Sequence, residues 1–264
     1  MQISGRVFVV TGAGSGIGRA TALQLLGRGA RIAAVDLHAQ ALDDLARLAR
    51  AGNRLSLHPL NIADRGAVES LPDAVIAAHG EVDGLLSIAG IIQPFDPVME
   101  LPLETAERVM AVNFWGTYYL DMAFLPHLVK RPEACLVNVS SMGALVPVPG
   151  QGVYGASKAA VLLLTECLYA ELRESCVAVT VVIPGAVGTN ITENSGVEAP
   201  VMVDGQGAKV TSADDAATQI IDAIRDGTFR VLIGGDARML DRMARLMPVR
   251  AITTVADRMK ALLG

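Results

Sequence analysis

Short apolar segments alternate with longer amphipathic segments along almost the whole chain. The short segments are rich in β-branched residues, and we predict strands at residues 6–10, 31–35, 54–58, 84–88, 135–139, 177–183 and 230–233. The longer segments follow helical periodicity, and we predict helices at residues 19–26, 38–51, 65–79, 104–128, 154–172 and 213–225. This alternation predicts an α/β fold: a single-domain, Rossmann-type, doubly wound parallel sheet of about seven strands with helices on both faces.

Several glycines and polar residues follow directly after the predicted strands. They are the turn after the first strand, Asp36, Ala89-Gly90, Ser141 and Pro184-Gly185. In a doubly wound sheet, ligands bind beyond the carboxyl ends of the strands. The pattern therefore predicts one crevice in which these segments meet.

The first of these turns has the composition of a nucleotide phosphate site. Gly12, Gly16 and Gly18 lie between a predicted strand and a predicted helix, where glycine lets the backbone approach a pyrophosphate at the helix N-terminus. The usual Gly-x-Gly-x-x-Gly spacing does not fit, because Ile17 stands where the third glycine would fall. A flexible surface turn is the alternative, but the strand–turn–helix context favours a dinucleotide site.

The second predicted strand ends at Asp36, eighteen residues beyond Gly18. A carboxylate at about this distance accepts hydrogen bonds from the adenosine ribose. Its negative charge would repel a 2′-phosphate, and neither Ser15 nor Leu37 supplies a cation to bind one. The sequence therefore favours NAD over NADP.

A possible acid–base site lies in the second half of the chain. Tyr154 and Lys158 are four residues apart, so a helix places the phenol and the ammonium on the same face. We expect the nearby cation to lower the pKa of the phenol, which normally ionises near pH ~10. Ser141, thirteen residues before the tyrosine, could hold a carbonyl or alcohol oxygen. A buried aromatic beside a solvated lysine is the alternative interpretation of the Tyr/Lys pair taken alone.

Composition limits the number of domains, the class of ligand and the cellular location that the sequence allows. The chain of 264 residues is 52% hydrophobic, which is enough for a large core in one domain, and its net charge of -5 argues against a nucleic-acid surface. The three cysteines lack paired spacing, so we expect reduced thiols and a cytoplasmic protein. We expect no signal peptide before the first strand, and prolines in the uncharged segment 134–157 argue against a membrane helix. The four scattered histidines indicate no metal site.

Together these motifs resemble the short-chain dehydrogenase/reductase family over residues 1–235. The resemblance rests on the Thr11–Gly18 turn, Asn113, Ser141, Tyr154 with Lys158, and Pro184–Thr189. It implies that Tyr154 is the general acid/base, that Lys158 lowers its pKa and binds the nicotinamide ribose, and that Ser141 holds the substrate oxygen. Asn113 would position a water that connects Lys158 to solvent. Ser140 is a rival to Ser141, but the interval to Tyr154 favours Ser141.

The resemblance also implies a set of cofactor contacts along the crevice. We expect them from Gly12, Ser15, Gly16, Ile17, Gly18, Asp36, Leu37, Asn61, Ile62, Ala89, Gly90, Tyr154, Lys158, Pro184, Gly185, Val187 and Thr189. Two segments depart from the family pattern. Asn61-Ile62 stands where an aspartate near the adenine is usual, and Ser87-Ile88 replaces two asparagines before Ala89-Gly90. The asparagine amide still offers an acceptor, so we expect cofactor binding to survive.

The expected activity is hydride transfer between NAD(H) and a neutral, fairly hydrophobic secondary alcohol or ketone. Candidate substrate contacts are Gln93, Met142 and Gln151, with Phe95, Ala144 and the segment 190–211, which is either a lid or a passive loop. The alternatives are a catalytically silent NAD-binding sensor or scaffold, and a sugar-nucleotide epimerase, which usually has a larger substrate domain. The intact Asn113, Ser141, Tyr154 and Lys158 set argues against a silent protein.

Two helical segments predict contacts beyond the site. The helix of Tyr154 carries no charge from 159 to 165, so we expect it to be buried on all sides, with a homodimer or homotetramer forming through it. Residues 236–264 are expected to form a C-terminal amphipathic helical extension, net +3, of the domain at 1–235. We expect helices at 238–247 and 252–263, separated at Pro248, with an apolar face on the first formed by Met239, Leu240, Met243, Leu246 and Met247. Docking of this extension on the protein is favoured over a membrane-surface contact.

Overall fold

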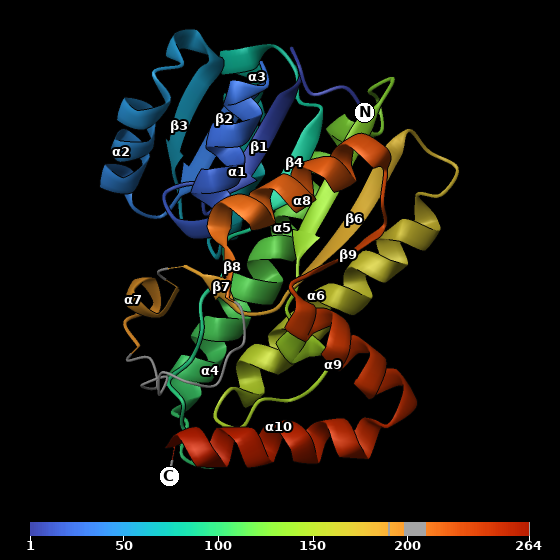
Figure 1. Ribbon diagram of the computed structural model, residues 1–264. Helices are drawn as coiled ribbons and strands as arrows, with labels where there is room; N and C mark the ends of the chain where they lie inside the picture. Colours follow the sequence, from blue (N-terminus) through green and yellow to red (C-terminus); the bar gives the residue numbers. More distant parts are fainter. Residues whose placement is uncertain (190, 198–209, 264) are drawn as a thin grey trace.

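The computed structural model describes residues 1–189, 191–197 and 210–263, with side chains to residue 260 (Figure 1). Its main sheet has seven parallel strands in the order β3-β2-β1-β4-β5-β6-β9, which confirms the predicted fold class. The strands are β1 (Val7–Thr11), β2 (Arg31–Asp36), β3 (Leu55–Pro59), β4 (Gly84–Ser87), β5 (Ala134–Val139), β6 (Val177–Pro184) and β9 (Arg230–Ile233). Two short strands, β7 (Val187–Gly188) and β8 (Thr211–Ser212), pair with each other.

Helices cover both faces of the main sheet (Figure 1). Apolar residues of α1 (Gly16–Gly27), α2 (Ala39–Ala49) and α8 (Ala213–Asp226) pack in one core. Those of α3 (Arg65–His79), α5 (Thr117–Leu128) and α6 (Gly152–Glu171) pack in the other. The remaining helices are α4 (Leu103–Met110), α7 (Ile191–Ser195), α9 (Gly235–Leu246) and α10 (Pro248–Leu263).

The two cores explain why the strands read as continuous apolar runs. On β1, Phe8 and Val10 point into the first core, whereas Val7 and Val9 point into the second. Successive strand residues face opposite sides of a sheet, so a strand covered on both faces needs apolar residues at every position. All five residues of β1 are buried.

The helix predicted at 104–128 is interrupted in the structure. A π-helical turn (Ala111–Gly116) separates α4 from α5. The side chain of Ile62 packs against Gly116 so closely that a β-carbon at this position would clash with it. The extra residue that a π-turn inserts re-aims the side chains beside it, and such turns occur frequently at functional sites. Here the turn contains Asn113.

The C-terminal extension packs against the domain through residues of both its helices. Leu240 on α9 and Ala251 on α10 form a small apolar cluster with Val146, which belongs to the loop after β5. Figure 1 shows α10 crossing the lower end of the molecule, beneath α6. The predicted apolar face of α9 is only partly correct, because Leu246 is 78% exposed. Proline fits the first turn of α10, since that position needs no backbone donor.

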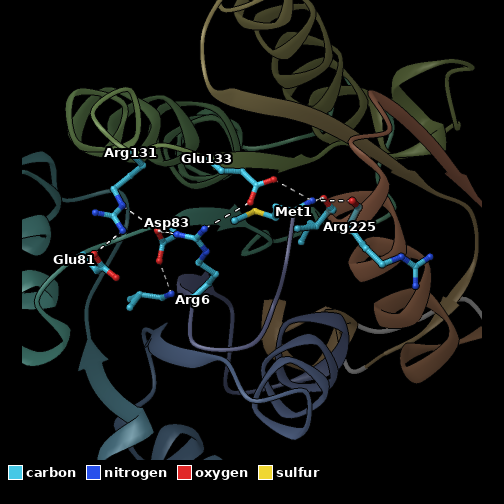
Figure 2. A network of polar contacts seen from close by, with 9 residues as sticks. Met1, Arg6, Glu81, Asp83, Arg131, Glu133 and Arg225 are labelled. Carbon is cyan, nitrogen blue, oxygen red and sulfur yellow. Dashed lines mark hydrogen bonds and ion pairs between the residues drawn. The ribbon is translucent and has the colours of Figure 1, made fainter.

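A charged network joins segments near the amino ends of the strands, opposite the predicted crevice (Figure 2). Asp83 is fully buried and accepts hydrogen bonds from Val7 N at 2.9 Å, Arg6 Nη1 at 3.2 Å and Arg131 Nε at 2.9 Å. Each charge in this network has an opposite partner, which offsets the loss of hydration. Further members are Met1, Glu81, Glu133 and Arg225.

Within the described part of the chain, no helix combines the length and the apolar character needed to cross a membrane.

Candidate active site

A cavity of about 390 Å³ opens at the carboxyl ends of the strands. It brings together segments from both halves of the chain. The predicted site residues that line it are Gly12, Ser15, Gly16, Ile17, Gly18, Ala89, Gly90, Ser141, Met142, Gln151, Tyr154, Lys158, Pro184, Gly185, Val187 and Thr189. Phe95 lines it as well, whereas Gln93, Asn113 and Ala144 do not. The one crevice expected from the strand ends is therefore present.

Close backbone contacts shape the glycine turn after β1. Gly12 and Gly16 have φ of +68° and +49°, a region that favours glycine. A β-carbon on Gly18 would collide with the carbonyl group of Gly12, so only glycine lets α1 begin this close to the strand. The turn thus presents backbone N–H groups at a helix N-terminus, which is a favourable place for a phosphate.

The second glycine segment, Ala89-Gly90, is held in place from β1. Thr11 Oγ1 accepts hydrogen bonds from Ile88 N at 3.0 Å and Ala89 N at 3.1 Å. A β-carbon on Gly90 would lie 3.0 Å from Lys158 Nζ, so glycine allows the lysine to approach this turn. The threonine supports the segment in which the usual asparagines are replaced.

Asp36 lies at the end of β2, outside the set of cavity-lining residues. Its Oδ2 accepts a hydrogen bond from Gly14 N at 2.9 Å, and its Oδ1 accepts one from His38 N at 3.0 Å. The carboxylate is therefore anchored beside the glycine turn. Leu37 next to it is exposed. The role of Asp36 as a contact of the adenosine ribose stays a prediction.

Asn61 and Ile62 lie after β3 and have separate structural contacts. Asn61 is exposed, and its Oδ1 accepts a hydrogen bond from Ala63 N at 3.0 Å. Ile62 is buried against the π-helical turn at Gly116. Neither residue lines the cavity.

Tyr154 and Ser141 both line the cavity and approach each other there. Tyr154 is in the first turn of α6, and Ser141 precedes a 3₁₀ turn (Met142–Ala144) after β5. Gly143 N donates to Ser141 Oγ at 3.1 Å, which orients the hydroxyl. A β-carbon on Gly143 would lie 3.5 Å from that oxygen and 3.6 Å from the ring of Tyr154. The two hydroxyl-bearing side chains thus flank the same small turn.

Lys158 lies one turn along α6 from Tyr154 and is almost fully buried. Its Nζ donates to Val139 O at 3.0 Å. Burial lowers the pKa of Lys158 to about 8, because the charged form loses hydration. Ser140 Oγ donates to the Lys158 carbonyl at 2.8 Å, so this neighbouring serine supports the helix backbone.

The expected effect of Lys158 on the tyrosine is not observed in this structure. Burial raises the pKa of Tyr154, and a hydrogen bond with Ser141 opposes this only in part. The prediction of a lowered pKa was wrong because it considered the nearby cation and left out desolvation of the phenolate. The phenol is therefore neutral at pH 7 in the protein alone.

Asn113 reaches the back of the site from the π-helical turn. Its Nδ2 donates to Ile91 O at 2.9 Å and to Ser157 Oγ at 3.0 Å, and its Oδ1 accepts from Ile91 N at 2.9 Å. Ser157 Oγ in turn donates to Tyr154 O at 2.7 Å. Asn113 therefore connects the segment after Gly90 to the helix that carries Tyr154 and Lys158.

The substrate contacts predicted from sequence separate into two groups. Met142 and Gln151 line the cavity, but Gln93 is fully buried behind it. Gln93 Oε1 accepts a hydrogen bond from Tyr154 N at 2.9 Å, so this side chain fastens the start of α6. Its prediction as a substrate contact was wrong, because the direction of a loop side chain depends on which segment packs over it.

Two contacts to the segment after β6 were missed by sequence reasoning. Asp236 Oδ2 accepts a hydrogen bond from Ala186 N at 2.6 Å, and its carboxylate occupies the space beside Gly185. Asn194 on α7 donates to Ser15 Oγ at 2.7 Å across the mouth of the cavity. Asp236 follows two glycines directly after the last strand. This position at a strand end was the only feature of the sequence that could have marked it as a site residue. Asn190 and residues 198–209 of the predicted lid lie outside the described residues.

Comparison with known proteins gives the same assignment along most of the chain. The short chain dehydrogenase family matches residues 6–199. The SadH protein of Mycobacterium tuberculosis is 36% identical over 260 residues, covering 93% of this chain and 92% of that protein. The 2-(R)-hydroxypropyl-CoM dehydrogenase of Xanthobacter autotrophicus is 34% identical over 248 residues, covering 92% of this chain and 96% of that enzyme.

Solved structures agree with the sequence comparison. A short chain dehydrogenase/reductase from Burkholderia phymatum in complex with NAD has a TM-score of 0.83 and 28% identity, covering 92% of this chain and 94% of that one. A short chain dehydrogenase from Burkholderia cenocepacia in complex with NADP has a TM-score of 0.82 and 27% identity, covering 97% and 99%. The fold, the matched residues and these relatives lead to one conclusion: the chain belongs to the short-chain dehydrogenase family.

Proposed function

We propose that this oxidoreductase transfers a hydride between NAD(H) and a neutral secondary alcohol or ketone. The observation that supports this most directly is the cavity itself. Ser141, Tyr154 and Lys158 line the same space as the glycine turn after β1. A site for a substrate oxygen therefore adjoins a site suited to a dinucleotide.

The residues present fit a nicotinamide dinucleotide. Gly18 brings the N-terminus of α1 close to the end of β1, and Gly90 leaves room beside Lys158 Nζ. The backbone N–H groups of the first turn suit a pyrophosphate. When bound, the cofactor supplies the nicotinamide ring that accepts or donates the hydride. Five residues of the segment Pro184–Thr189 also line the cavity, and this segment is the expected holder of the carboxamide.

In this proposal Tyr154 moves the proton at the substrate oxygen. In the reducing direction its neutral phenol donates a proton to the developing alkoxide, and in the oxidising direction its phenolate removes the alcohol proton. The Ser141 hydroxyl holds that same oxygen during the transfer. Lys158 is expected to bind the nicotinamide ribose, while Asn113 fixes the start of α6 through Ser157.

The position of Asp36 supports NAD rather than NADP as the cofactor. Its carboxylate is fixed by Gly14 N and His38 N, and a 2′-phosphate at this place would meet a negative charge. We expect Asp36→Ala to narrow the preference for NAD over NADP. The measurement is kcat/KM with each cofactor, and an unchanged ratio would contradict the assignment.

The lining of the cavity supports a neutral substrate. Of the described residues that line it, Lys158 alone carries a charge, and apolar side chains such as Ile92, Phe95 and Met142 form much of the remaining wall. A carboxylate or phosphate on the substrate would find no arginine there. A fairly hydrophobic alcohol or ketone fits this environment.

A spectrophotometric assay tests the proposed activity. Incubation with NAD and a panel of secondary alcohols should produce NADH, which is followed by its absorbance. Tyr154→Phe should abolish turnover because the proton-transferring hydroxyl is gone, and it should retain most of the cofactor affinity because the aromatic ring and Lys158 stay in place. Tyr169→Phe, on an exposed position of the same helix, is the matched control. Full activity of Tyr154→Phe would refute the mechanism, and cofactor binding without turnover of any substrate would favour a sensor.

The surface of α6 supports assembly of two or four copies through this helix. Val161 is fully buried against the sheet, but Leu163 on the outer side is 69% exposed. An apolar residue this exposed suits a subunit contact. Sedimentation at micromolar concentration should show a homodimer or homotetramer, and a strict monomer would contradict this. We also place the protein in the cytoplasm, where its free Cys135, Cys167 and Cys176 would remain reduced.

A further inference from the structure

We infer that Asn194 is a positioning residue for the dinucleotide. It holds the Ser15 hydroxyl away from the helix that this serine would otherwise cap, and leaves the hydroxyl proton to donate to a phosphate oxygen. This inference rests on the proposed function, because it concerns the part of the cavity assigned to the pyrophosphate. It adds a residue from α7, beyond the segment Pro184–Thr189.

Ser15 is the N-cap residue of α1 but does not cap the helix with its side chain. A serine at this position usually accepts a hydrogen bond from a backbone N–H of the first turn. Ser15 has the extended backbone typical of an N-cap, with φ of −153° and ψ of 171°, yet its hydroxyl makes no capping bond. The first N–H groups of an α-helix have no acceptor within the helix. Those of α1 are therefore not occupied by the residue best placed to satisfy them.

Asn194 explains why the hydroxyl is turned away. Its Nδ2 donates to Ser15 Oγ at 2.7 Å, although the two residues are 179 positions apart in the chain. Both residues line the cavity. Ser15 is partly exposed and Asn194 is exposed, so a ligand in the cavity can reach this pair.

The direction of this hydrogen bond determines what the pair offers to a ligand. A serine hydroxyl has one proton to donate, and here its oxygen is the acceptor of the Asn194 bond. The hydroxyl proton is therefore left to donate elsewhere, and the Asn194 amide has a second N–H of its own. Together with the first N–H groups of α1, these are all donors. Such a group suits the oxygens of a pyrophosphate.

The helix that carries Asn194 is fixed by contacts that do not involve Ser15. Ser195, the next residue, is buried, and its Oγ accepts a hydrogen bond from Ile92 N at 3.0 Å. Arg108 Nη2 on α4 lies 3.5 Å from Ser195 O. These contacts hold α7 in place, so the Asn194 amide is kept within reach of the serine hydroxyl.

Removing the Asn194 amide should change the cofactor site through Ser15. Without this donor, the Ser15 hydroxyl can rotate and accept a hydrogen bond from the first turn of α1, as N-cap serines do. It would then compete with the phosphate for the same N–H groups. An aspartate at position 194 would be worse, because its carboxylate accepts the hydroxyl proton and places a negative charge beside the phosphate.

A double-mutant cycle measured by calorimetric titration tests the inference with the full-length protein. The ligands are NAD and ADP-ribose, which has the pyrophosphate but lacks the nicotinamide ring. Asn194→Ala should weaken the binding of both ligands by about 10-fold, and Asn194→Asp by more. In the Ser15→Ala background, Asn194→Ala should weaken binding by less than about 2-fold. Additive losses in the two backgrounds, or a weaker effect of Asn194→Asp than of Asn194→Ala, would overturn the inference.

Arg108→Ala is the control for a general displacement of α7. It removes the contact with Ser195 O but leaves the bond between Asn194 and Ser15, so NAD affinity should stay within about 2-fold of the native value. A loss equal to that of Asn194→Ala would contradict the assignment.

Turnover separates this inference from the proposed function. Asn194→Ala should raise the KM for NAD by about 10-fold without lowering kcat, because the residue does not touch the reacting atoms. If the native protein binds NAD but oxidises no alcohol, the proposed function fails and the mutant cycle still decides the inference. If the native protein binds neither NAD nor ADP-ribose, both fail.

Discussion

Asp121 and Asn138 are joined by a single hydrogen bond in the middle of the protein, from Asn138 Nδ2 to Asp121 Oδ2 at 2.8 Å. Both residues are fully buried, one on α5 and the other on β5. Asp121 Oδ1 and Asn138 Oδ1 have no partner among the described residues. Burial raises the pKa of Asp121 to about 8. A protonated carboxyl would donate to Asn138 Oδ1 and satisfy both oxygens, so we interpret Asp121 as neutral at pH 7.

This protonation makes stability depend on pH. The folded-state pKa of Asp121 lies above the unfolded value of about 3.9, so its stabilising contribution is complete below that value and is lost as pH rises through about 8. The limiting slope is about 1.4 kcal/mol per pH unit for one proton. We expect Asp121→Asn to remove this slope, because the new amide donates to Asn138 Oδ1 at every pH.

Urea denaturation between pH 5 and 9 measures the effect. The free energy of unfolding of the native protein should fall relative to that of Asp121→Asn as pH rises. Asp226→Asn, at an exposed position on α8, is the control and should follow the native curve. Parallel curves for the native protein and Asp121→Asn would show that Asp121 is already ionised.

Lys158 should also make the free energy of unfolding depend on pH, but in the opposite direction and at higher pH. Its folded pKa of about 8 lies below the unfolded value of about 10.4, so between these values the unfolded chain binds more protons. Stability should therefore rise with pH, relative to Lys158→Met, by up to about 1.4 kcal/mol per unit between pH 8 and 9.5. Guanidinium denaturation measures this, with the exposed Lys130→Met as control. A constant difference across the window would exclude a buried, titrating amine.

Ser56 connects two histidines between β3 and α3. Its Oγ lies 2.7 Å from His58 Nε2 and 2.8 Å from His79 Nε2. Burial lowers the pKa of both histidines, so their contribution to stability is present above about pH 6.5 and is lost as pH falls through the lower folded values. The double change His58→Gln and His79→Gln should flatten the decline in stability between pH 7 and 5.

Ser56→Ala tests the shared hydroxyl at neutral pH. It leaves the buried Nε2 of His79 without its partner, and we expect a loss of about 1–2 kcal/mol in the free energy of unfolding. His38→Gln, at an exposed position, should have no such effect. An unchanged free energy of unfolding for Ser56→Ala would mean that the hydrogen bonds of this hydroxyl to the two histidines do not stabilise the fold.

Asp236 should support cofactor binding although it lies in the C-terminal extension. Removing its carboxylate frees Ala186 N and opens space beside Gly185, both next to the proposed nicotinamide site. A charge-assisted hydrogen bond contributes about 1.5–3 kcal/mol, so Asp236→Ala should weaken NAD binding by about 10-fold or more. Asp236→Asn should have a smaller effect because an amide oxygen can still accept.

Calorimetric titration with NAD measures this change, and Asp257→Ala on the exposed side of α10 is the control. Thermal unfolding of the same variants separates loss of affinity from loss of structure. Unchanged NAD affinity in a folded Asp236→Ala protein would show that the Ala186 contact does not position the cofactor loop.

The sequence predicted the features that depend on local geometry. The strands and most helices followed from periodicity, because residues two apart on a strand and three or four apart on a helix always share a face. The same rule placed Lys158 one turn from Tyr154. The order of strands and helices predicted the parallel sheet, and with it the shared edge at which the glycine turn and Ser141 meet.

The tertiary structure decided the features that join distant segments or depend on burial. Asp236 contacts Ala186 fifty residues away, Gln93 turns behind the cavity to bind the start of α6, and a π-helical turn aims Asn113 at Ile91. The direction of the pKa change at Tyr154 was also decided there. Local periodicity determines which face a residue occupies, but only the packing of elements determines what lies opposite that face and how much water remains.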